Sequence, residues 1–288
     1  MTRAQETSSE TRARVGVFRY APPEPTALHR ELAGELWTAG RDLRPVPPLS
    51  VRHPDLTLAD AYAVQHLVKA REVADGATIV GCKIGATSKA IQQMFDIDHP
   101  DSGFLTDRMI LADKTRLDVS RFISPKVEGE IAFRIGEDLA GADVTAQDVL
   151  DASAEVYPVL EVLDSRFRNW RIKLVDTVAD NASTAGAVLG APAPHQGVDL
   201  AAEWMTFEAG GQVQRAQGSA VMGHPAESVA CLVRILSAQQ EGIRAGEIVL
   251  AGSWAGAVDL VPGTVVSASF PSLGSVSLTV DGPDTAAD

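Results

Sequence analysis

The sequence has little of what marks secreted, membrane-bound or nucleic-acid-binding proteins. It contains two cysteines, Cys82 and Cys231, with no CxxC spacing, so we expect free packing thiols in a reducing compartment. Lysine and arginine total 25 against 38 acidic residues, and the net charge of −13 disfavours binding to nucleic acid or an anionic membrane. Residues 1–14 lack the apolar core of a signal peptide, and no apolar run reaches membrane-spanning length. We therefore expect a globular, cytoplasmic protein.

Several catalytic motifs are also missing. The six histidines show no HxH or HExxH spacing, which disfavours a zinc site. No GxSxG, GxGxxG or Walker-type loop stands in a suitable strand–turn–helix context. There is no internal repeat and no strict alternation of strands and helices, so a doubly wound or barrel α/β fold is not expected.

The pattern instead predicts an α+β protein that is mostly strands with flanking helices. Leucines at helical spacing follow Thr26, and Thr57-Leu58-Ala59-Asp60 resembles a capping box that starts a second helix. The Pro-rich stretch 43–56 between them is predicted to be extended, and residues 96–103 are predicted to form a turn-rich loop. The division that follows is a loosely held tail, an N-terminal helical part, a catalytic β domain and a second tail: residues 1–25, 26–76, 77–281 and 282–288.

Two carboxylates lie two residues apart in the apolar run 125–133. Because side chains alternate along a strand, Glu128 and Glu130 point to the same face, and Gly129 between them lets another element come close. Two acids on one buried face repel each other and are costly to desolvate, a cost that a hard divalent cation removes. The alternative is that both glutamates form the wet face of an edge strand.

A third acid, Glu161, lies in the next apolar run, 156–163. Three carboxylates on neighbouring strands would supply one face of an oxygen-ligand octahedron and leave the other positions for water and substrate. The alternative is that Glu161 forms an ion pair with Arg166 or Lys173.

Lys83 is unusual because it lies inside an apolar strand that ends at Gly85. A lysine there either reaches out to solvent or is held by an acid, and Asp101 is a candidate partner. A buried Lys–Asp pair beside a metal could handle protons, since burial and neighbours can bring a lysine pKa towards neutrality, but an ordinary salt bridge is the alternative. Four further polar residues could cap a helix or line the same site: Asp176, Asp180, Asn181 and Ser183.

These residues together carry a family resemblance. Over about residues 57–281, and in the same order of motifs, the chain resembles the hydratase/decarboxylase branch of the fumarylacetoacetate hydrolase superfamily. The matching motifs are Gly81-Cys82-Lys83-Ile84-Gly85, His99-Pro100-Asp101-Ser102-Gly103, Glu128-Gly129-Glu130, Leu160 to Arg166, Asn169 to Ser183, and Leu273 to Val276.

The resemblance implies a mixed β-roll core with N-terminal and flanking helices. It implies Mg²⁺ or Mn²⁺ held by Glu128, Glu130 and Glu161, and a small anionic 2-oxo acid or 2-hydroxydienoic acid as substrate. Homo-oligomers, often pentamer-based, are common in this family. Lys83 and Asp101 are then the expected catalytic residues.

The resemblance favours a 2-hydroxypenta-2,4-dienoate (2-keto-4-pentenoate) hydratase of a meta-cleavage pathway for aromatic or steroid compounds. The alternatives are a 2-oxo-3-hexenedioate (4-oxalocrotonate) decarboxylase, an acylpyruvate-type C–C hydrolase, and a structural partner of another pathway enzyme. The segment Ala251–Val258 does not match the hydratase pattern, and the bulky Trp254 is expected where the pocket closes. The residues expected to bind substrate are Ser183, Asp180, Asn181 and Trp254.

Overall fold

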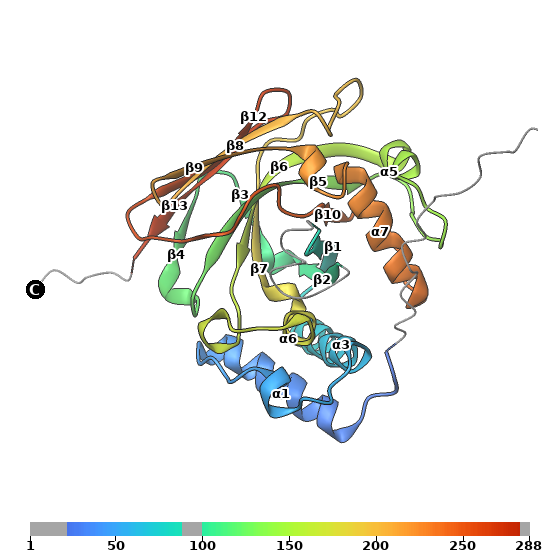
Figure 1. Ribbon diagram of the computed structural model, residues 1–288, viewed down its shortest axis with the longest axis vertical. Coiled ribbons are helices and arrows are strands. Elements are labelled where there is room, and N and C mark those ends of the chain that lie inside the picture. Colours follow the sequence, from blue (N-terminus) through green and yellow to red (C-terminus); the bar gives the residue numbers. More distant parts are fainter. Residues whose placement is uncertain (1–21, 88–99, 283–288) are drawn as a thin grey trace, which may run out of the picture.

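The computed structural model describes residues 22–87 and 100–282 (Figure 1). The predicted tails, apart from residues 22–25 and Gly282, lie outside these ranges, as does His99 of the second motif. The described chain is an α+β structure in which helices accompany two curled mixed sheets. Within it, no helix combines the length and the apolar character needed to cross a membrane.

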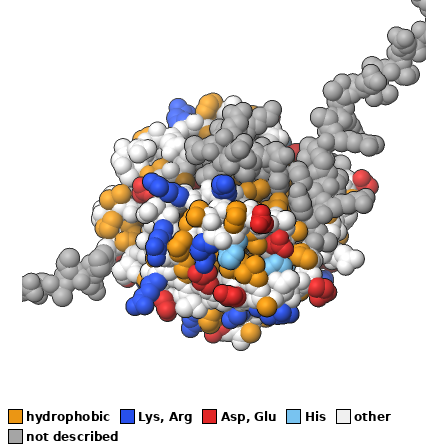
Figure 2. Space-filling view, turned by 60° about the horizontal axis from the view of Figure 1, so that its bottom comes forward, with side chains coloured by type: hydrophobic (Ala, Val, Ile, Leu, Met, Phe, Trp, Pro, Cys, Tyr) orange, Lys and Arg blue, Asp and Glu red, His pale blue; other side chains and the backbone are white. Residues whose placement is uncertain are grey.

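The N-terminal helices begin where the sequence offers caps. Helix α1 (Ala27–Asp42) and helix α3 (Leu58–Ala74) pack against each other, and the short α2 (Leu49–Arg52) lies between them in the chain. As predicted, Thr57 caps α3, because its hydroxyl accepts the Asp60 N–H at 3.2 Å. The His29 ring donates to the Asp60 carboxylate at 3.0 Å and so joins the starts of the two helices. The face that they form carries both acidic and basic side chains among apolar ones (Figure 2).

A mixed sheet of eight strands carries the sequence-predicted acids. Its spatial order is β2–β1–β10–β5–β6–β7–β3, and β11 also pairs with β5. The long antiparallel pair β5/β6 forms its centre, and β1 reaches β5 through β10. The strands are β1 (Ile79–Gly85), β2 (Asp101–Thr106), β3 (Ile110–Ala112), β5 (Lys126–Ile135), β6 (Ser153–Leu163), β7 (Thr184–Leu189), β10 (Ile248–Leu250) and β11 (Val258–Asp259).

A second sheet has the order β4–β13–β12–β8–β9, in which β8 and β9 form an antiparallel hairpin. Its strands are β4 (Thr115–Asp118), β8 (Trp204–Ala209), β9 (Gln212–Gln217), β12 (Val265–Phe270) and β13 (Gly274–Asp281). The remaining helices are α5 (Ala146–Ala152), α6 (Leu174–Ala179) and α7 (Pro225–Ala238). Short 3₁₀ turns occur at Asp107–Met109, Val119–Arg121, Arg168–Trp170, Asn181–Ser183 and Gly218–Ala220.

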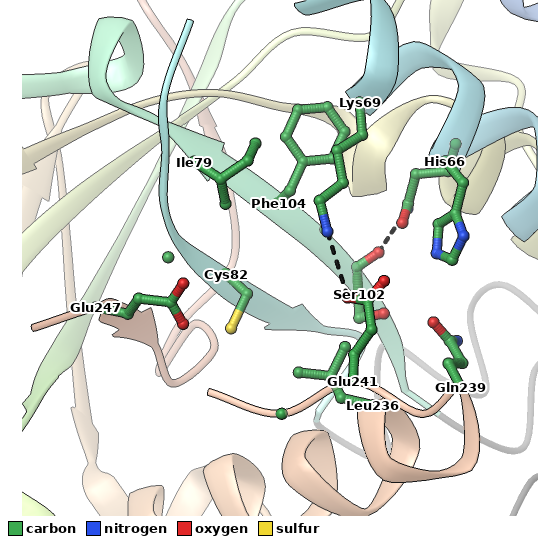
Figure 3. Close-up of a pocket in the computed structure, with 14 residues that line it drawn as sticks. His66, Lys69, Ile79, Cys82, Ser102, Phe104, Leu236, Gln239, Glu241 and Glu247 are labelled. Carbon is green, nitrogen blue, oxygen red and sulfur yellow. Dashed lines mark hydrogen bonds and ion pairs between the residues drawn. The ribbon is translucent and has the colours of Figure 1, made fainter. Parts of the chain in front are cut away.

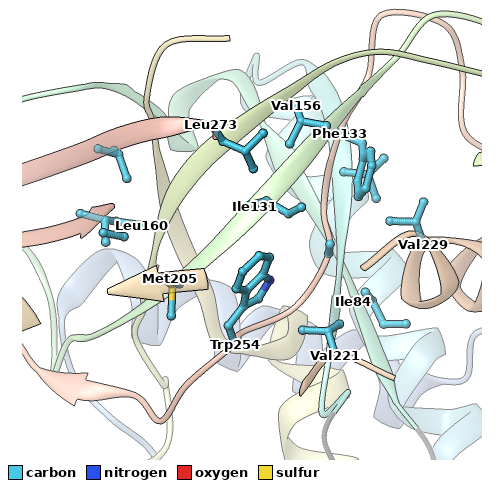
Figure 4. Packing of buried hydrophobic residues seen from close by; sticks show 14 of the residues in the cluster. Ile84, Ile131, Phe133, Val156, Leu160, Met205, Val221, Val229, Trp254 and Leu273 are labelled. Atoms are coloured by element: carbon cyan, nitrogen blue, oxygen red, sulfur yellow. The ribbon is translucent and has the colours of Figure 1, made fainter. Parts of the chain in front are cut away.

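The main core lies where the two sheets meet (Figure 4). Ile131 and Phe133 of β5 share a fully buried cluster with Met205 and Phe207 of β8, as expected for the face opposite the glutamates. An ideal Cβ placed on Gly129 would lie 2.7 Å from the Met205 sulfur. The predicted close approach at this glycine is therefore confirmed.

Two predicted irregular segments contain regular structure. Asp101 and its neighbours belong to β2 and not to a loop, because Asp101 pairs with Gly85 of β1 in an antiparallel ladder. Tertiary pairing here overrides the local turn preference of the sequence. Helix α2 interrupts the predicted extended stretch 43–56, since proline is tolerated at a helix start and Pro48 stands at that position.

A substitution at Gly81 tests how closely β1 packs against β10. An ideal Cβ at Gly81 would lie 1.9 Å from the Ile248 carbonyl oxygen, so alanine would push the two strands apart. We expect Gly81→Ala to lower the free energy of unfolding by about 3 kcal/mol, measured by urea denaturation. The control is Gly40→Ala in α1, where the Cβ would meet only the Arg166 side chain at 3.6 Å; helix propensity predicts a gain of roughly 0.5 kcal/mol. Equal stability of the two variants would contradict this packing.

Candidate active site

The register of β5 and β6 brings the predicted acids onto one face. Glu128 stands directly opposite Glu161, and Glu130 follows two residues along the same strand. Glu130 and Glu161 are 0% and 1% exposed, and β5 lies between β10 and β6 rather than at a sheet edge. The alternative of a wet edge strand is therefore wrong.

Lys83 and Asp101 reach the same face from β1 and β2. The Lys83 ammonium lies 3.3 Å from a Glu161 carboxylate oxygen, with both side chains buried. Glu161 thus pairs with Lys83, and the alternative pairing with Arg166 or Lys173 is wrong. An ideal Cβ on Gly85 would lie 2.2 Å from Asp101 Oδ1 and 3.1 Å from Lys83 Nζ, so this glycine leaves room for both groups.

Burial and neighbouring charges together set the ionisation of this cluster. Burial raises the pKa of Glu128 to about 8, with a further rise from Glu161 and an opposing effect of Lys83. Burial and the neighbouring Glu161 also raise the pKa of Glu130 well above its usual range. For Lys83, burial lowers the pKa, but Glu161, Asp101 and the other two carboxylates outweigh burial and raise it overall. The predicted shift of Lys83 towards neutrality is therefore wrong for the metal-free site.

The carboxylates have the chemistry of a hard-cation site but not a ready-made geometry. Among residues 22–87 and 100–282, no three acidic, histidine or cysteine side chains form a preformed cation cluster. Instead the Thr184 hydroxyl donates to Glu161, and the Gly252 N–H donates to Glu130 Oε2 at 2.6 Å. Glu130 Oε1 stays buried without a hydrogen-bond partner in the described chain. A buried, unpartnered carboxylate oxygen in an all-oxygen donor set fits a hard divalent cation.

A cavity of ≈ 640 Å³ borders this face of the sheet. Its polar end carries Lys83, Asp101, Glu128 and Glu161. Most of the remaining wall is apolar or small, including Leu163, Trp170, Ile172, Leu174, Ala182 and Trp254. A ligand with an anionic head and an uncharged tail matches this division.

The predicted substrate-binding residues divide into two groups. Ser183 and Trp254 line the cavity, and the Ser183 hydroxyl is buried without a described partner. Phe270 holds Trp254 in place through an edge-to-face contact, with 5.1 Å between the ring centroids. Asp180 and Asn181 are not part of the described cavity wall.

Asp180 and Asn181 instead hold the loop that presents Ser183. Both ends of the Asn181 amide bind the Phe104 backbone of β2, at 2.8 and 3.0 Å. Asp180 binds the Arg166 side chain and, at 3.0 Å, the Arg166 backbone N–H. Successive residues 181–183 have φ values of 55°, 50° and 56°, a left-handed run that such contacts must maintain.

A smaller hollow lies on the other face of β1 (Figure 3). Its volume is ≈ 50 Å³, and Cys82 and His66 are among its lining residues. The Lys69 ammonium lies 3.2 Å from the Glu241 carboxylate across it. Both cysteines are free, as predicted, and burial raises the pKa of Cys82. The hollow is too small for an organic acid, so the larger cavity is the candidate site.

Residues 73–281 match the family model of the fumarylacetoacetate (FAA) hydrolase C-terminal domain. The chain belongs to the fumarylacetoacetate hydrolase family. It is 42% identical over 248 residues to a 2-hydroxyhexa-2,4-dienoate hydratase of Comamonas testosteroni, covering 84% of this chain and 94% of that protein. It is 40% identical over 248 residues to a 2-keto-4-pentenoate hydratase of Paraburkholderia xenovorans LB400, covering 85% and 92%. The fold also matches a 4-oxalocrotonate decarboxylase from Pseudomonas putida G7, complexed with magnesium and adipate: TM-score 0.86, 34% identity, 90% of this chain and 99% of that one.

Sequence reasoning missed several residues of this fumarylacetoacetate hydrolase family site. Thr184 donates a hydrogen bond to Glu161, and Gly252 donates one to Glu130. Their positions in the sequence, beside Ser183 and two residues before Trp254, could have indicated them. Lys126 also lines the cavity, and the alternation of β5 could have found it, since it lies two residues before Glu128.

The raised pKa of Glu128 predicts how the metal-free protein responds to pH. Folding moves this pKa from 4.5 to about 8, so the folded state holds the proton more tightly. The contribution of this pKa difference to the free energy of unfolding is present in full below pH 4.5. It is lost as the pH rises through the folded-state pKa of about 8. We expect the free energy of unfolding, measured by urea denaturation with a chelator, to fall between about pH 5 and 8, and Glu128→Gln to flatten this fall. The exposed Glu137→Gln is the control and should keep the full slope; an unchanged slope in Glu128→Gln would contradict the assignment.

Proposed function

We propose that this protein is a metal-dependent hydratase that adds water to 2-hydroxypenta-2,4-dienoate or a related 2-oxo-enoic acid. The product is a 4-hydroxy-2-oxo acid, in a meta-cleavage-type degradation of aromatic or steroid compounds. The observation that carries the proposal is the buried Lys83–Glu161 contact beside Glu128, at the polar end of a cavity with a largely apolar wall. The two hydratase relatives, at 42% and 40% identity, support it.

Glu128, Glu130 and Glu161 are the residues that would hold Mg²⁺ or Mn²⁺. The unpartnered Glu130 oxygen and the raised pKa of Glu128 both indicate that Lys83 alone does not balance the negative charge of the three carboxylates. The solved decarboxylase relative is complexed with magnesium. Such a cation would polarise the carboxylate and the 2-oxygen of the substrate and stabilise negative charge that develops there.

Proton transfer falls to Lys83 and Asp101. Converting the dienol to the 2-oxo-3-enoate removes the proton of the 2-hydroxyl group and adds one at C5. Water then adds with its hydroxyl at C4 and a proton at C3, which gives the 4-hydroxy-2-oxo acid. Lys83, whose pKa the neighbouring carboxylates raise, can donate a proton, while Asp101 Oδ1 lacks a described hydrogen-bond partner and can accept one. Ser183, also unpartnered, can orient the substrate.

The second candidate is decarboxylation of 2-oxo-3-hexenedioate. It is favoured by the likeness to the P. putida G7 4-oxalocrotonate decarboxylase, with a TM-score of 0.86. The electrons left when the C–CO₂ bond breaks would move through the conjugated chain to the 2-oxygen of the substrate, and the same charged end of the cavity would stabilise the negative charge there. Release of CO₂ from 2-oxo-3-hexenedioate distinguishes the two reactions.

The proposal extends to the setting of the enzyme. The β domain over residues 77–281 would carry catalysis, with residues 26–76 as its helical cover. The protein would act in the cytoplasm as a homo-oligomer, alone or in a complex with another enzyme of the pathway. Size-exclusion chromatography with light scattering measures the oligomeric state.

Glu130→Gln tests the proposed function, because it keeps the shape of the side chain while removing a charged ligand. We expect Mg²⁺-dependent turnover of 2-hydroxypenta-2,4-dienoate to fall by at least about 100-fold in a steady-state assay. Glu137→Gln again serves as the control. Full metal-dependent turnover by Glu130→Gln would end the proposal.

A further inference from the structure

Lys126 is a second cationic side chain in the wall of the cavity. It lines the cavity on β5 and lies two residues before Glu128, on the same face of the strand. Two residues of a strand span about 6.6 Å, which is comparable to the length of a short carbon chain. A substrate whose head lies at the glutamates can therefore bring its tail to the Lys126 side chain.

Lys126 already has two partners. Its ammonium contacts the Asp259 carboxylate, and these residues face each other in the β5/β11 pair. The same ammonium lies 5.5 Å from the centre of the Trp170 ring. Trp170 is itself fixed, because its indole N–H donates to the Ser124 carbonyl at 3.0 Å. Lys126 is thus neutralised by one neighbour and covered by another.

The described cavity wall offers no cationic side chain beyond Lys83 and Lys126 for a second carboxylate. Of these two, Lys83 is engaged by Glu161. A dicarboxylic substrate needs a cation at the tail end to offset the cost of burying its second carboxylate. With Lys126 paired to Asp259, that cation is not available.

We propose that Asp259 is a specificity-determining residue that neutralises Lys126 and thereby selects monocarboxylic 2-oxo acids with an uncharged tail over dicarboxylic ones. The inference rests on the proposed function and narrows its substrate class. Asp259 acts through Lys126 and touches no reacting atom. It rejects the unwanted substrate by withholding a charge partner, which is a common route to specificity.

Binding of two matched probes tests this inference. Isothermal titration calorimetry with Mg²⁺ present gives the affinities of 2-oxohexanoate and 2-oxohexanedioate, which have equal chain lengths and differ in the tail carboxylate. The natural sequence should prefer the monoacid. Asp259→Asn should reduce this preference by up to about fivefold, the upper end for an exposed ion pair, since the Asp259 side chain is 73% exposed. The added change Lys126→Met should restore the preference, which a merely structural effect of Asp259→Asn would not do.

Asp281→Asn is the control, because Asp281 pairs with Arg116 on the second sheet and does not line the cavity. It should leave the preference unchanged. A preference of the natural sequence for the diacid would overturn the inference, and so would an unchanged preference in Asp259→Asn. In both cases, binding of either acid would still support the proposed function. If neither acid binds with Mg²⁺ present, both are wrong.

Discussion

Glu128 and Glu161 face each other across two central strands, and the repulsion between them shapes the rest of the site. Holding such charges away from water is costly unless something of opposite sign lies close. The protein offsets the cost with the Lys83 ammonium and with donors from Thr184 and Gly252, and burial raises the pKa of Glu128. A divalent cation would compete with the proton that Glu128 binds, so metal binding and the stability of the site form one coupled equilibrium.

The helical part is tied to this site by buried polar contacts. The Ser50 hydroxyl at α2 donates to the buried Asp176 carboxylate of α6 at 2.6 Å, and α6 supplies Leu174 to the cavity wall. The Gln65 amide of α3 donates to the Ser102 carbonyl of β2 at 2.7 Å and to the Val178 carbonyl of α6 at 2.8 Å. The helices therefore position two walls of the cavity, and a change in their packing would alter the site.

Features that depend on the pattern of a single strand can be predicted from the sequence. Features that depend on pairing with a distant segment of the chain cannot. Strand alternation is enough to place Glu128 and Glu130 on one face. The strand containing Asp101 was missed because its ladder with β1, and not its own composition, makes it extended. Ser183, which faces the cavity, could not be distinguished from Asp180 and Asn181, since that difference depends on a left-handed loop. The pairing of Lys126 with Asp259 joins residues 133 positions apart, which no local pattern reveals.

Anomalous diffraction from crystals grown with Mn²⁺ tests the central claim most directly, because it locates the ion independently of turnover. The account predicts one strong manganese peak bonded to the carboxylates of Glu128, Glu130 and Glu161. A manganese peak bound elsewhere, or none at these residues at saturating Mn²⁺ with the Lys83–Glu161 contact unchanged, would contradict it.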